Sequence, residues 1–278
     1  CLQANEFVIN VRGTQAIKSC CYVGYSMYFK DELNLAKLPK NTIKDVDPVT
    51  GKKIVWIQQD KTDDFWQKGL DASDYIARLL DYVAVKYVDE ILDYSDMNKY
   101  IEIVALSNLF LLENIIPDFV SIGELKYLFT SLIKERVSVK DVVYVFEKIN
   151  DLSTDPTKDD LLCGLRRYLA RNISASLVAD NGTINLVELS EKSLKSLTGE
   201  KDENSVVKIE STKIEKILKK INTVLEEKNL KMKDVAIVLP ANIRQIGFLV
   251  LSKFAPEVKV VAREEITTDF PSKIVAEI

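Results

Sequence analysis

Histidine is absent from all 278 residues of the sequence. Histidine is the usual general base of serine and cysteine hydrolases, a common zinc ligand and the side chain that titrates near neutral pH. Its absence excludes a Ser-His-Asp triad, a Cys-His pair and a histidine-ligated metal site. The sequence therefore lacks the residue on which many catalytic sites depend.

Cysteine is scarce and badly spaced for metal binding. The four cysteines are Cys1, Cys20, Cys21 and Cys163, and no C-x-x-C motif occurs. Neighbouring residues on a strand point to opposite faces, so Cys20 and Cys21 are poorly placed to coordinate the same metal ion. We expect reduced, buried thiols in a cytosolic protein and no metal site; the sequence assigns no role to Cys20 and Cys21.

The sequence also lacks an excess of positive charge and any long apolar run. Its 38 basic and 42 acidic residues sum to −4, which leaves no net field to attract nucleic acid. No window approaches the roughly 18 apolar residues that span a bilayer. With 47% hydrophobic residues and only nine glycines and seven prolines, the chain has a folded composition.

Charged pairs carry no recognisable catalytic pattern. Adjacent positions on a helix do not face each other, so neighbouring carboxylates form no dyad and are expected to be solvated. Basic pairs are likewise expected on exposed helix faces. The pairs are Asp63-Asp64, Asp159-Asp160, Glu226-Glu227, Glu264-Glu265, Arg166-Arg167 and Lys219-Lys220. The sequence thus predicts no enzyme and no cofactor, although an enzyme that uses carboxylates without histidine stays an alternative.

The first half of the chain mixes strand and helix patterns. Residues 5–12 alternate and end at Gly13, and with Ala16 to Phe29 they predict a hairpin or adjacent strands. Ile54 to Ile57 predicts a short strand, and an apolar stripe from Ser73 predicts a helix.

The middle of the chain is predicted to be helical. Ser95 is expected to cap a helix over 96–106, and Ser121-Ile122-Gly123-Glu124 fits a capping box. Ser138 is expected to open a helix that ends near Asn150, and Asp155-Pro156 another.

The last third predicts an α/β module. Asn181-Gly182 between apolar runs predicts a hairpin that joins 177–179 to 184–187. Helices are expected at 211–228 and 241–254, and strands at 235–239, 258–262 and 273–277.

One stretch resembles a known family. Leu112-Glu113-Asn114-Ile115-Ile116-Pro117-Asp118-Phe119-Val120-Ser121-Ile122-Gly123-Glu124-Leu125, continued by Leu132 to Asp141, is similar to the paired "VPDLLSLGELQ" and "LLRERVSIRDL" runs of the type III export-gate family. Weaker similarity covers Asn5 to Gly13, Asp47 to Gly51 with Val55-Trp56-Ile57, Asp71 to Leu80, and Leu239 to Ile266.

The resemblance implies an α/β and α multidomain fold with four subdomains, in which small α/β units flank a central helical unit. Placed on this sequence, the subdomains are 1–41 with 91–110, which would be incomplete at its start; 42–90; 111–175; and 176–278. Family members have a cytoplasmic ring of nine such domains at the inner membrane of bacteria.

The resemblance also implies a function. Family members dock export chaperone–substrate complexes, contact other export-apparatus proteins and pass substrates to the membrane channel, and they have no known active site. The "VRG" and "DPVTG" wording favours the flagellar over the injectisome branch. The alternatives are a protein-binding module of another assembly and a processed lipoprotein that begins at Cys1.

In flagellar relatives the complexes dock in an apolar dimple between the first two subdomains. The matching positions are Ile54, Trp56, Asp64, Phe65, Trp66, Gln67 and Met97. Two tryptophans and a phenylalanine in a polar context are also typical of interface anchors. The competing interpretation is that Trp56 and Phe65 fill a small core, whereas Trp66 is expected to be exposed.

Overall fold

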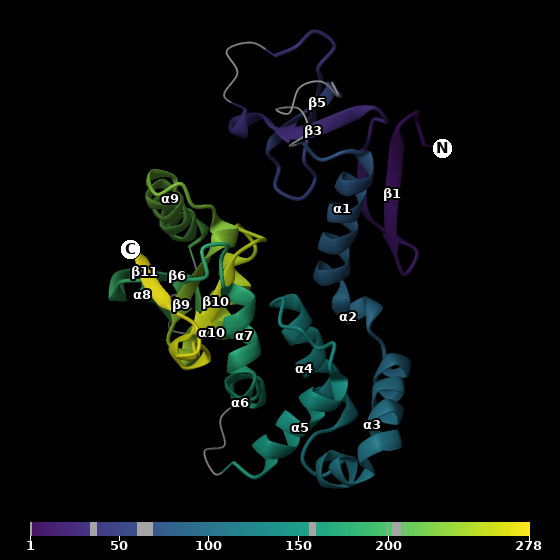
Figure 1. Cartoon of the computed structure of the whole chain (residues 1–278), viewed down its shortest axis with the longest axis vertical. Helices are drawn as coiled ribbons and strands as arrows, with labels where there is room; N and C mark the ends of the chain where they lie inside the picture. The colour runs from purple at the N-terminus through teal and green to yellow at the C-terminus, as the bar shows by residue number, and fades with distance from the viewer. Residues whose placement is uncertain are drawn as a thin grey trace. The chain divides into compact units, whose positions relative to one another are not determined.

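The structure is a computed structural model of the chain, and it describes residues 2–33, 38–59, 69–155, 160–198, 200–201, 207–208 and 210–278. The chain divides into two compact units, Cys1–Leu92 and Asp93–Ile278. Each unit has helices and strands, which confirms the expected mixed fold class (Figure 1).

Unit 1 begins with the hairpin that the alternating pattern predicts. Strands β1 (Glu6–Val11) and β2 (Thr14–Cys20) pair antiparallel. Arg12 and Gly13 between them have φ values of 49° and 81°. Positive φ at both central residues is the geometry of a two-residue hairpin turn whose twist matches that of the strands.

A second sheet of unit 1 has the order β3-β5-β4 and is antiparallel. Its strands are β3 (Tyr25–Phe29), β4 (Ile43–Val46) and β5 (Lys53–Gln58), with a short 3-10 turn η1 (Lys30–Glu32) after β3. Because β3 lies within 1–41 and pairs with β5 within 42–90, this sheet crosses the boundary expected at residue 41. The division into four subdomains stays a prediction.

Helix α1 (Ala72–Lys86) supplies the other side of the core of unit 1 and leads into α2 (Val88–Ile91). Asp71 caps α1 by accepting a hydrogen bond from the Asp74 N–H at 2.8 Å. The core joins both sheets to α1 through a common set of buried side chains: Val11, Ile17, Met27, Ile54, Trp56, Tyr75, Leu79 and Val83.

Unit 2 opens with five helices. These are α3 (Tyr94–Ile115), α4 (Ile122–Lys134), α5 (Val142–Ser153), α6 (Leu161–Tyr168) and α7 (Ala170–Leu177). Ser121 and Glu124 form the predicted capping box of α4. Asp93 and Asp141, instead of the expected Ser95 and Ser138, cap α3 and α5.

The cap of α6 also differs from expectation. Asp160 accepts hydrogen bonds from the N–H groups of Leu162 and Cys163, so this helix begins later than the expected start at Asp155-Pro156. Pro156 itself lies outside the described residues. Aspartate is a favoured N-cap residue and the sequence has one at both Asp155 and Asp160, so residue type alone could not fix where α6 begins.

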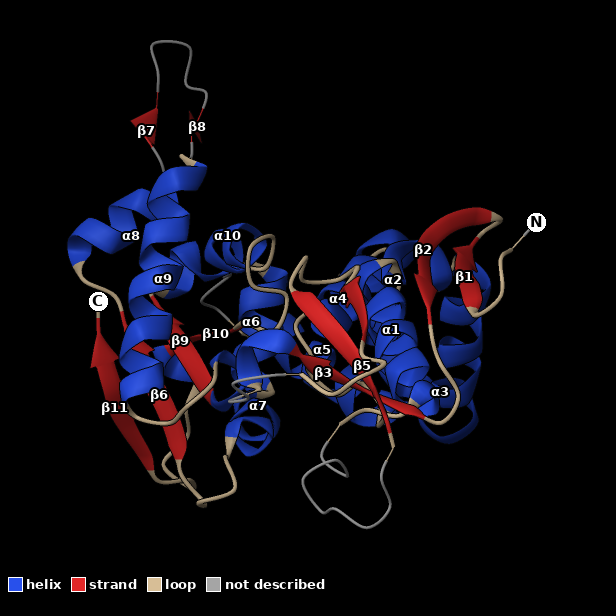
Figure 2. Ribbon diagram, turned by 90° about the horizontal axis from the view of Figure 1, so that it is seen from above, coloured by secondary structure: helices blue, strands red, loops and turns tan. Residues whose placement is uncertain are grey.

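The rest of unit 2 surrounds a parallel sheet of order β10-β9-β6-β11 (Figure 2). Its strands are β6 (Ile184–Glu188), β9 (Val235–Leu239), β10 (Lys259–Ala262) and β11 (Ser272–Glu277). The connecting elements are α8 (Glu191–Thr198), β7 (Glu200–Lys201), β8 (Val207–Lys208), α9 (Ser211–Glu227), η3 (Met232–Asp234), α10 (Ala241–Leu251) and η4 (Arg263–Glu265).

Two elements of the α/β part fold as their sequence periods require. In α9 the buried residues recur every three or four positions, at Ile214, Ile217, Leu218, Ile221 and Leu225, and they pack in one core with the sheet. The central strand β9 is buried at four of its five positions, as expected for a parallel strand covered on both faces.

The prediction of a hairpin at Asn181-Gly182 is wrong. The turn itself forms, since the Gly182 N–H donates to Ala179 O at 2.8 Å and Gly182 has φ of 75°. It joins the end of helix α7 to β6, however, and β6 pairs in parallel with β9 and β11. A tight turn reverses the chain whatever element precedes it, so the dipeptide could not identify a strand on its upstream side.

Candidate functional site

The described members of the predicted docking set are buried. Ile54 and Trp56 on β5 are 1% and 0% exposed, and Met97 on α3 is 0% exposed. Asp64, Phe65, Trp66 and Gln67 lie outside the described residues. The structure thus assigns Ile54, Trp56 and Met97 to cores, which for Trp56 agrees with the competing interpretation. Direct partner contact through these three side chains would require them to leave those cores.

Trp56 is the centre of an aromatic cluster in unit 1. Its ring meets Tyr75 edge-on at 5.1 Å and Tyr22 at 5.5 Å between centroids. The Tyr75 hydroxyl lies 3.0 Å from Ser19 Oγ in a buried hydrogen bond. Burial raises the pKa of Tyr75 to about 12, only partly offset by that hydrogen bond. Tyr75 is therefore neutral across the physiological range and acts as a packing residue.

An ion pair that the sequence did not reveal fixes the loop before β5. The guanidinium of Arg78 on α1 donates to both carboxylate oxygens of Asp47, at 2.8 and 3.0 Å. The Thr50 N–H and hydroxyl donate to the same carboxylate. Burial alone would raise the pKa of Asp47, but the hydrogen bonds from Arg78 and Thr50 and the Arg78 charge hold it below its usual range.

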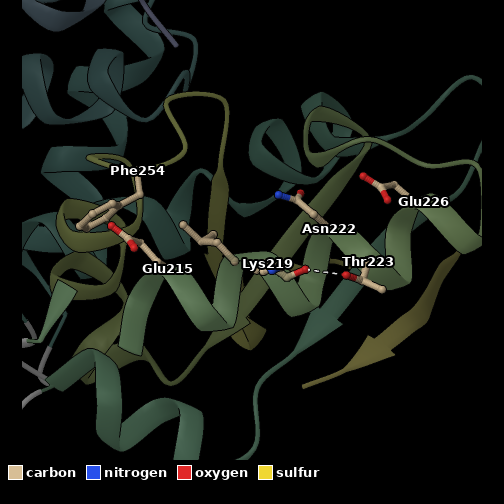
Figure 3. Close-up of a pocket in the computed structure, with 7 residues that line it drawn as sticks. Glu215, Lys219, Asn222, Thr223, Glu226 and Phe254 are labelled. Carbon is tan, nitrogen blue, oxygen red and sulfur yellow. Dashed lines mark hydrogen bonds between the residues drawn. The ribbon is translucent and has the colours of Figure 1, made fainter. Parts of the chain in front are cut away.

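A shallow groove of about 440 Å³ runs along the exposed side of α9 (Figure 3). Side chains at helical spacing line it, with Phe254 at one end: Glu215, Leu218, Lys219, Asn222, Thr223, Glu226 and Phe254. The Thr223 hydroxyl donates to its own helix backbone at Lys219 O, 3.0 Å away. The groove is lined by charges of both signs, which suits contact with a polar surface.

The most unusual polar feature of unit 2 is a buried cluster of four charges. Arg166 on α6 donates through Nε and Nη2 to the two oxygens of Glu265 in η4, at 2.6 and 2.7 Å. Both side chains are 2% exposed. The sequence had placed Arg166-Arg167 and Glu264-Glu265 on solvated surfaces, and for Arg166 and Glu265 that expectation is wrong.

The other two members complete the charge balance. Arg244 on α10 donates to the carboxylate of Glu135, the residue that follows α4. The Nε atom of Arg244 also lies 3.5 Å from Oε1 of Glu265. Arg166 Nη1 lies 3.1 Å from Glu135. Burial works against the charged form of Arg166, yet the hydrogen bond to Glu265 and the two carboxylates raise its pKa overall. Two cations and two anions therefore neutralise each other away from water.

This cluster joins the helices of unit 2 to its parallel sheet. Ser174 on α7 adds a second tie, because its hydroxyl donates to Glu265 O and accepts from the Thr267 N–H, both at 2.9 Å. The four charged groups of the cluster are engaged with one another, so they offer no free acid, base or nucleophile to a substrate. The geometry supports a structural role.

Metal-ligand clusters and membrane-spanning helices are both lacking among the described residues. In that part of the chain, no group of three or more Cys, Asp or Glu side chains is placed to hold a metal ion. None of the helices there combines the length and the apolarity that crossing a membrane requires.

Comparison with known families decides the identity. The FHIPEP family matches residues 1–271. The chain belongs to the FHIPEP family. Among its curated relatives is the flagellar biosynthesis protein FlhA of Bacillus subtilis (strain 168), 21% identical over 276 residues, which cover 95% of this chain and 40% of that protein. FlhA of Buchnera aphidicola subsp. Schizaphis graminum is 24% identical, over 96% of this chain and 38% of that protein.

Solved structures share the fold over the whole length. The Shigella flexneri MxiA protein aligns with a TM-score of 0.76 at 16% identity, over 100% of this chain and 86% of that one. The C-terminal domain of InvA aligns with a TM-score of 0.69 at 14% identity, over 100% and 86%. The resemblance to the cytoplasmic domain of the type III export gate is confirmed. The chain spans about two fifths of the length of the two curated relatives.

Proposed function

We propose that this FHIPEP chain is the cytoplasmic docking domain of a type III protein export gate. In this role it receives export chaperone–substrate complexes and passes substrates to the membrane channel. The observation that carries the proposal is the family match over residues 1–271. The flagellar branch is favoured over the injectisome branch, because the curated relatives are FlhA proteins of flagellar biosynthesis. The likeness to MxiA and InvA, at 16% and 14% identity, concerns the fold alone and does not choose between the branches.

Self-association into a ring is part of the proposal. The EscV cytosolic domain from a type III secretion system is nonameric and shares this fold, with a TM-score of 0.66 over 98% of this chain. A ring needs two different surfaces on each copy that meet head to tail. The Chlamydia pneumoniae CdsV protein, which forms a complex with CdsO, also has this fold, at a TM-score of 0.75. Contact with another export-apparatus protein is proposed by analogy.

The role is non-catalytic. The sequence has no histidine, and the buried charges of the described residues neutralise each other. We therefore propose that the chain hydrolyses no nucleotide, holds no cofactor and binds no nucleic acid. Its proposed place is the cytoplasmic face of the bacterial inner membrane, where the parent protein is anchored.

Binding and export are the tests. We expect purified chaperone–substrate complexes from the same genome to bind the chain in calorimetry, and chaperones without substrate to bind more weakly. Mass photometry at rising concentration should show closed oligomers. In the host, deletion of the codons for this chain should stop flagellar export. Intact export together with no binding by any complex would overturn the proposal.

A further inference from the structure

One face of helix α9 in unit 2 forms the groove of about 440 Å³. The lining residues of α9 recur every three or four positions and so share one side of the helix (Figure 3): Glu215, Leu218, Lys219, Asn222, Thr223 and Glu226. All of them except Leu218 are exposed. The three charged side chains of this face form no ion pair within the part of the chain that the structure describes. The face is therefore open to another molecule.

The charges of α9 run against the dipole of the helix. Positions 211–220 hold four lysines and one glutamate, whereas 221–227 hold two glutamates and no basic residue. The N-terminal end of a helix carries partial positive charge and favours acidic side chains, and the C-terminal end favours basic ones. The charge distribution of α9 therefore costs stability in the single chain. Departures from local preference of this kind are expected where a helix serves a contact outside its own fold.

The same charges are complementary to a second copy of α9 that runs antiparallel to the first. Lys219 and Glu226 lie about 10 Å apart along the helix axis, at equal distances from the midpoint between Asn222 and Thr223. A two-fold axis beside that midpoint places each Lys219 opposite Glu226 of the partner subunit. Asn222 and Thr223 at the centre are short and uncharged, so they let two helices approach closely. The antiparallel orientation also sets the basic half of each helix against the acidic half of the other.

We propose that the groove along α9 binds the α9 helix of a second copy of this chain, antiparallel and about a two-fold axis. Phe254, which is 40% exposed at one end of the groove, adds an apolar contact at each end of the pair. A foreign helix with the usual acidic start and basic end matches these charges only when it runs parallel to α9, with the two dipoles opposed to that arrangement. A second copy satisfies charges and dipoles together.

This contact is distinct from the contact of the proposed ring. A two-fold contact uses the same surface on both copies and joins chains in pairs, whereas a ring needs two different surfaces that meet head to tail. The residues expected to dock chaperone complexes do not line the groove either. The pairing through α9 is therefore additional to the proposed function.

The test exchanges charges in the 278-residue chain and follows self-association by sedimentation velocity at low salt. Lys219→Glu and Glu226→Lys each turn two attractive contacts of the pair into two repulsive ones, so each variant alone should associate about tenfold more weakly than the parent. An equimolar mixture of the two variants should restore the pair, because each substituted side chain then meets one of opposite charge. Association of the parent should weaken with added salt, since the screening length falls from about 10 Å at 0.1 M to about 3 Å at 1 M.

Controls separate pairing from folding and locate the contact. Lys52→Glu makes the same charge change at an exposed lysine of unit 1, so it should associate like the parent and should not restore Glu226→Lys. Glu226→Lys places a cation in the last turn of α9 and should melt no lower than the parent, so its weaker association is not a loss of folding. A photoreactive benzoylphenylalanine in place of Lys216, beside the groove, should crosslink to α9 of the other copy in a mixture of light and nitrogen-15-labelled chains.

A parent chain that stays monomeric at millimolar concentration would overturn the inference, as would a mixture of the two variants that stays dissociated. Oligomers larger than a pair that Lys219→Glu abolishes would assign α9 to the ring contact instead. Unchanged self-association of the variants with weaker binding of chaperone–substrate complexes would assign the groove to that partner. Chaperone binding is measured separately by calorimetry, so failure of the pairing leaves the docking function to its own test.

Discussion

The Nε atom of Arg166 donates a hydrogen bond to Oε1 of Glu265 at 2.6 Å, although 99 residues separate the two in the sequence. With Arg244 and Glu135 they form a neutral buried cluster where helices α4, α6 and α10 meet. Removal of one charge from such a cluster leaves its partner buried and uncompensated, which costs more than the pair itself contributes.

Arg166→Met should therefore lower the free energy of unfolding of unit 2 by about 3–5 kcal/mol. Both tryptophans, Trp56 and Trp66, lie in unit 1, whereas most helical residues lie in unit 2. Urea unfolding followed by circular dichroism at 222 nm should thus shift to lower urea, and the tryptophan fluorescence transition should move much less.

Arg171→Ala is the control for that experiment, because the Arg171 side chain is 79% exposed and lies 3.6 Å from Asp269 at the surface. Surface ion pairs contribute about 0–1 kcal/mol. The double variant Arg166→Met with Glu265→Met should recover part of the loss, since the Arg244–Glu135 pair remains. Equal stability of Arg166→Met and the parent would show that the cluster is solvated in solution.

The two tryptophans should respond in opposite ways. Trp56→Ala empties a fully buried site and should cost about 3–5 kcal/mol of stability, seen as a lower melting temperature in calorimetry. Trp66→Ala is expected to melt like the parent and to weaken chaperone–substrate binding about tenfold. A large drop in melting temperature for Trp66→Ala would place that residue in a core as well.

Asp47 should make unit 1 sensitive to acid. Its pKa is lowered in the folded state, so its contribution is present above its unfolded pKa of about 4 and is lost as the pH falls through the folded value. Asp47→Asn should lower the free energy of unfolding of unit 1 by roughly 2–3 kcal/mol at pH 7, which is the contribution expected of hydrogen bonds to a charged group. Urea unfolding followed by tryptophan fluorescence measures this difference, which should shrink below about pH 4. A difference that stays constant down to pH 2 would contradict the assignment.

Helix caps give a test on matched residues. Asp141 accepts a hydrogen bond from the Tyr144 N–H at 3.0 Å, whereas the Ser138 hydroxyl meets the Lys140 N–H only at 3.5 Å. Asp141→Ala should cost about 1 kcal/mol in thermal unfolding followed at 222 nm, and Ser138→Ala should cost little. A larger loss of stability for Ser138→Ala than for Asp141→Ala would identify Ser138 as the cap, as the sequence had suggested.

Much of the secondary structure could be read from the sequence. The capping box of α4, the strand β1 within the expected 5–12, the helical period of α9 and the strand at 235–239 all appear where expected. These features depend on residues a few positions apart, whose side chains meet whatever the rest of the chain does. The family resemblance was readable for the same reason, since it lies in two neighbouring helix starts.

The candidate site was less predictable. Sequence similarity proposed Trp56 as a docking residue, but the structure packs it against Tyr75 and Tyr22. An apolar aromatic side chain is equally suited to a core and to an interface. Only the residues that pack around it in the folded chain determine which of the two it occupies.

The sequence alone determined the absence of histidine chemistry, the mixed α/β class, the family and the position of most helices and strands. The tertiary structure alone decided how these elements pair. It joined β6 to β9 and β11 instead of to residues 177–179, and it buried Arg166 against Glu265. The physical reason is common to both cases: a local pattern specifies a conformation, whereas burial and pairing depend on residues dozens of positions away that only the folded chain brings together.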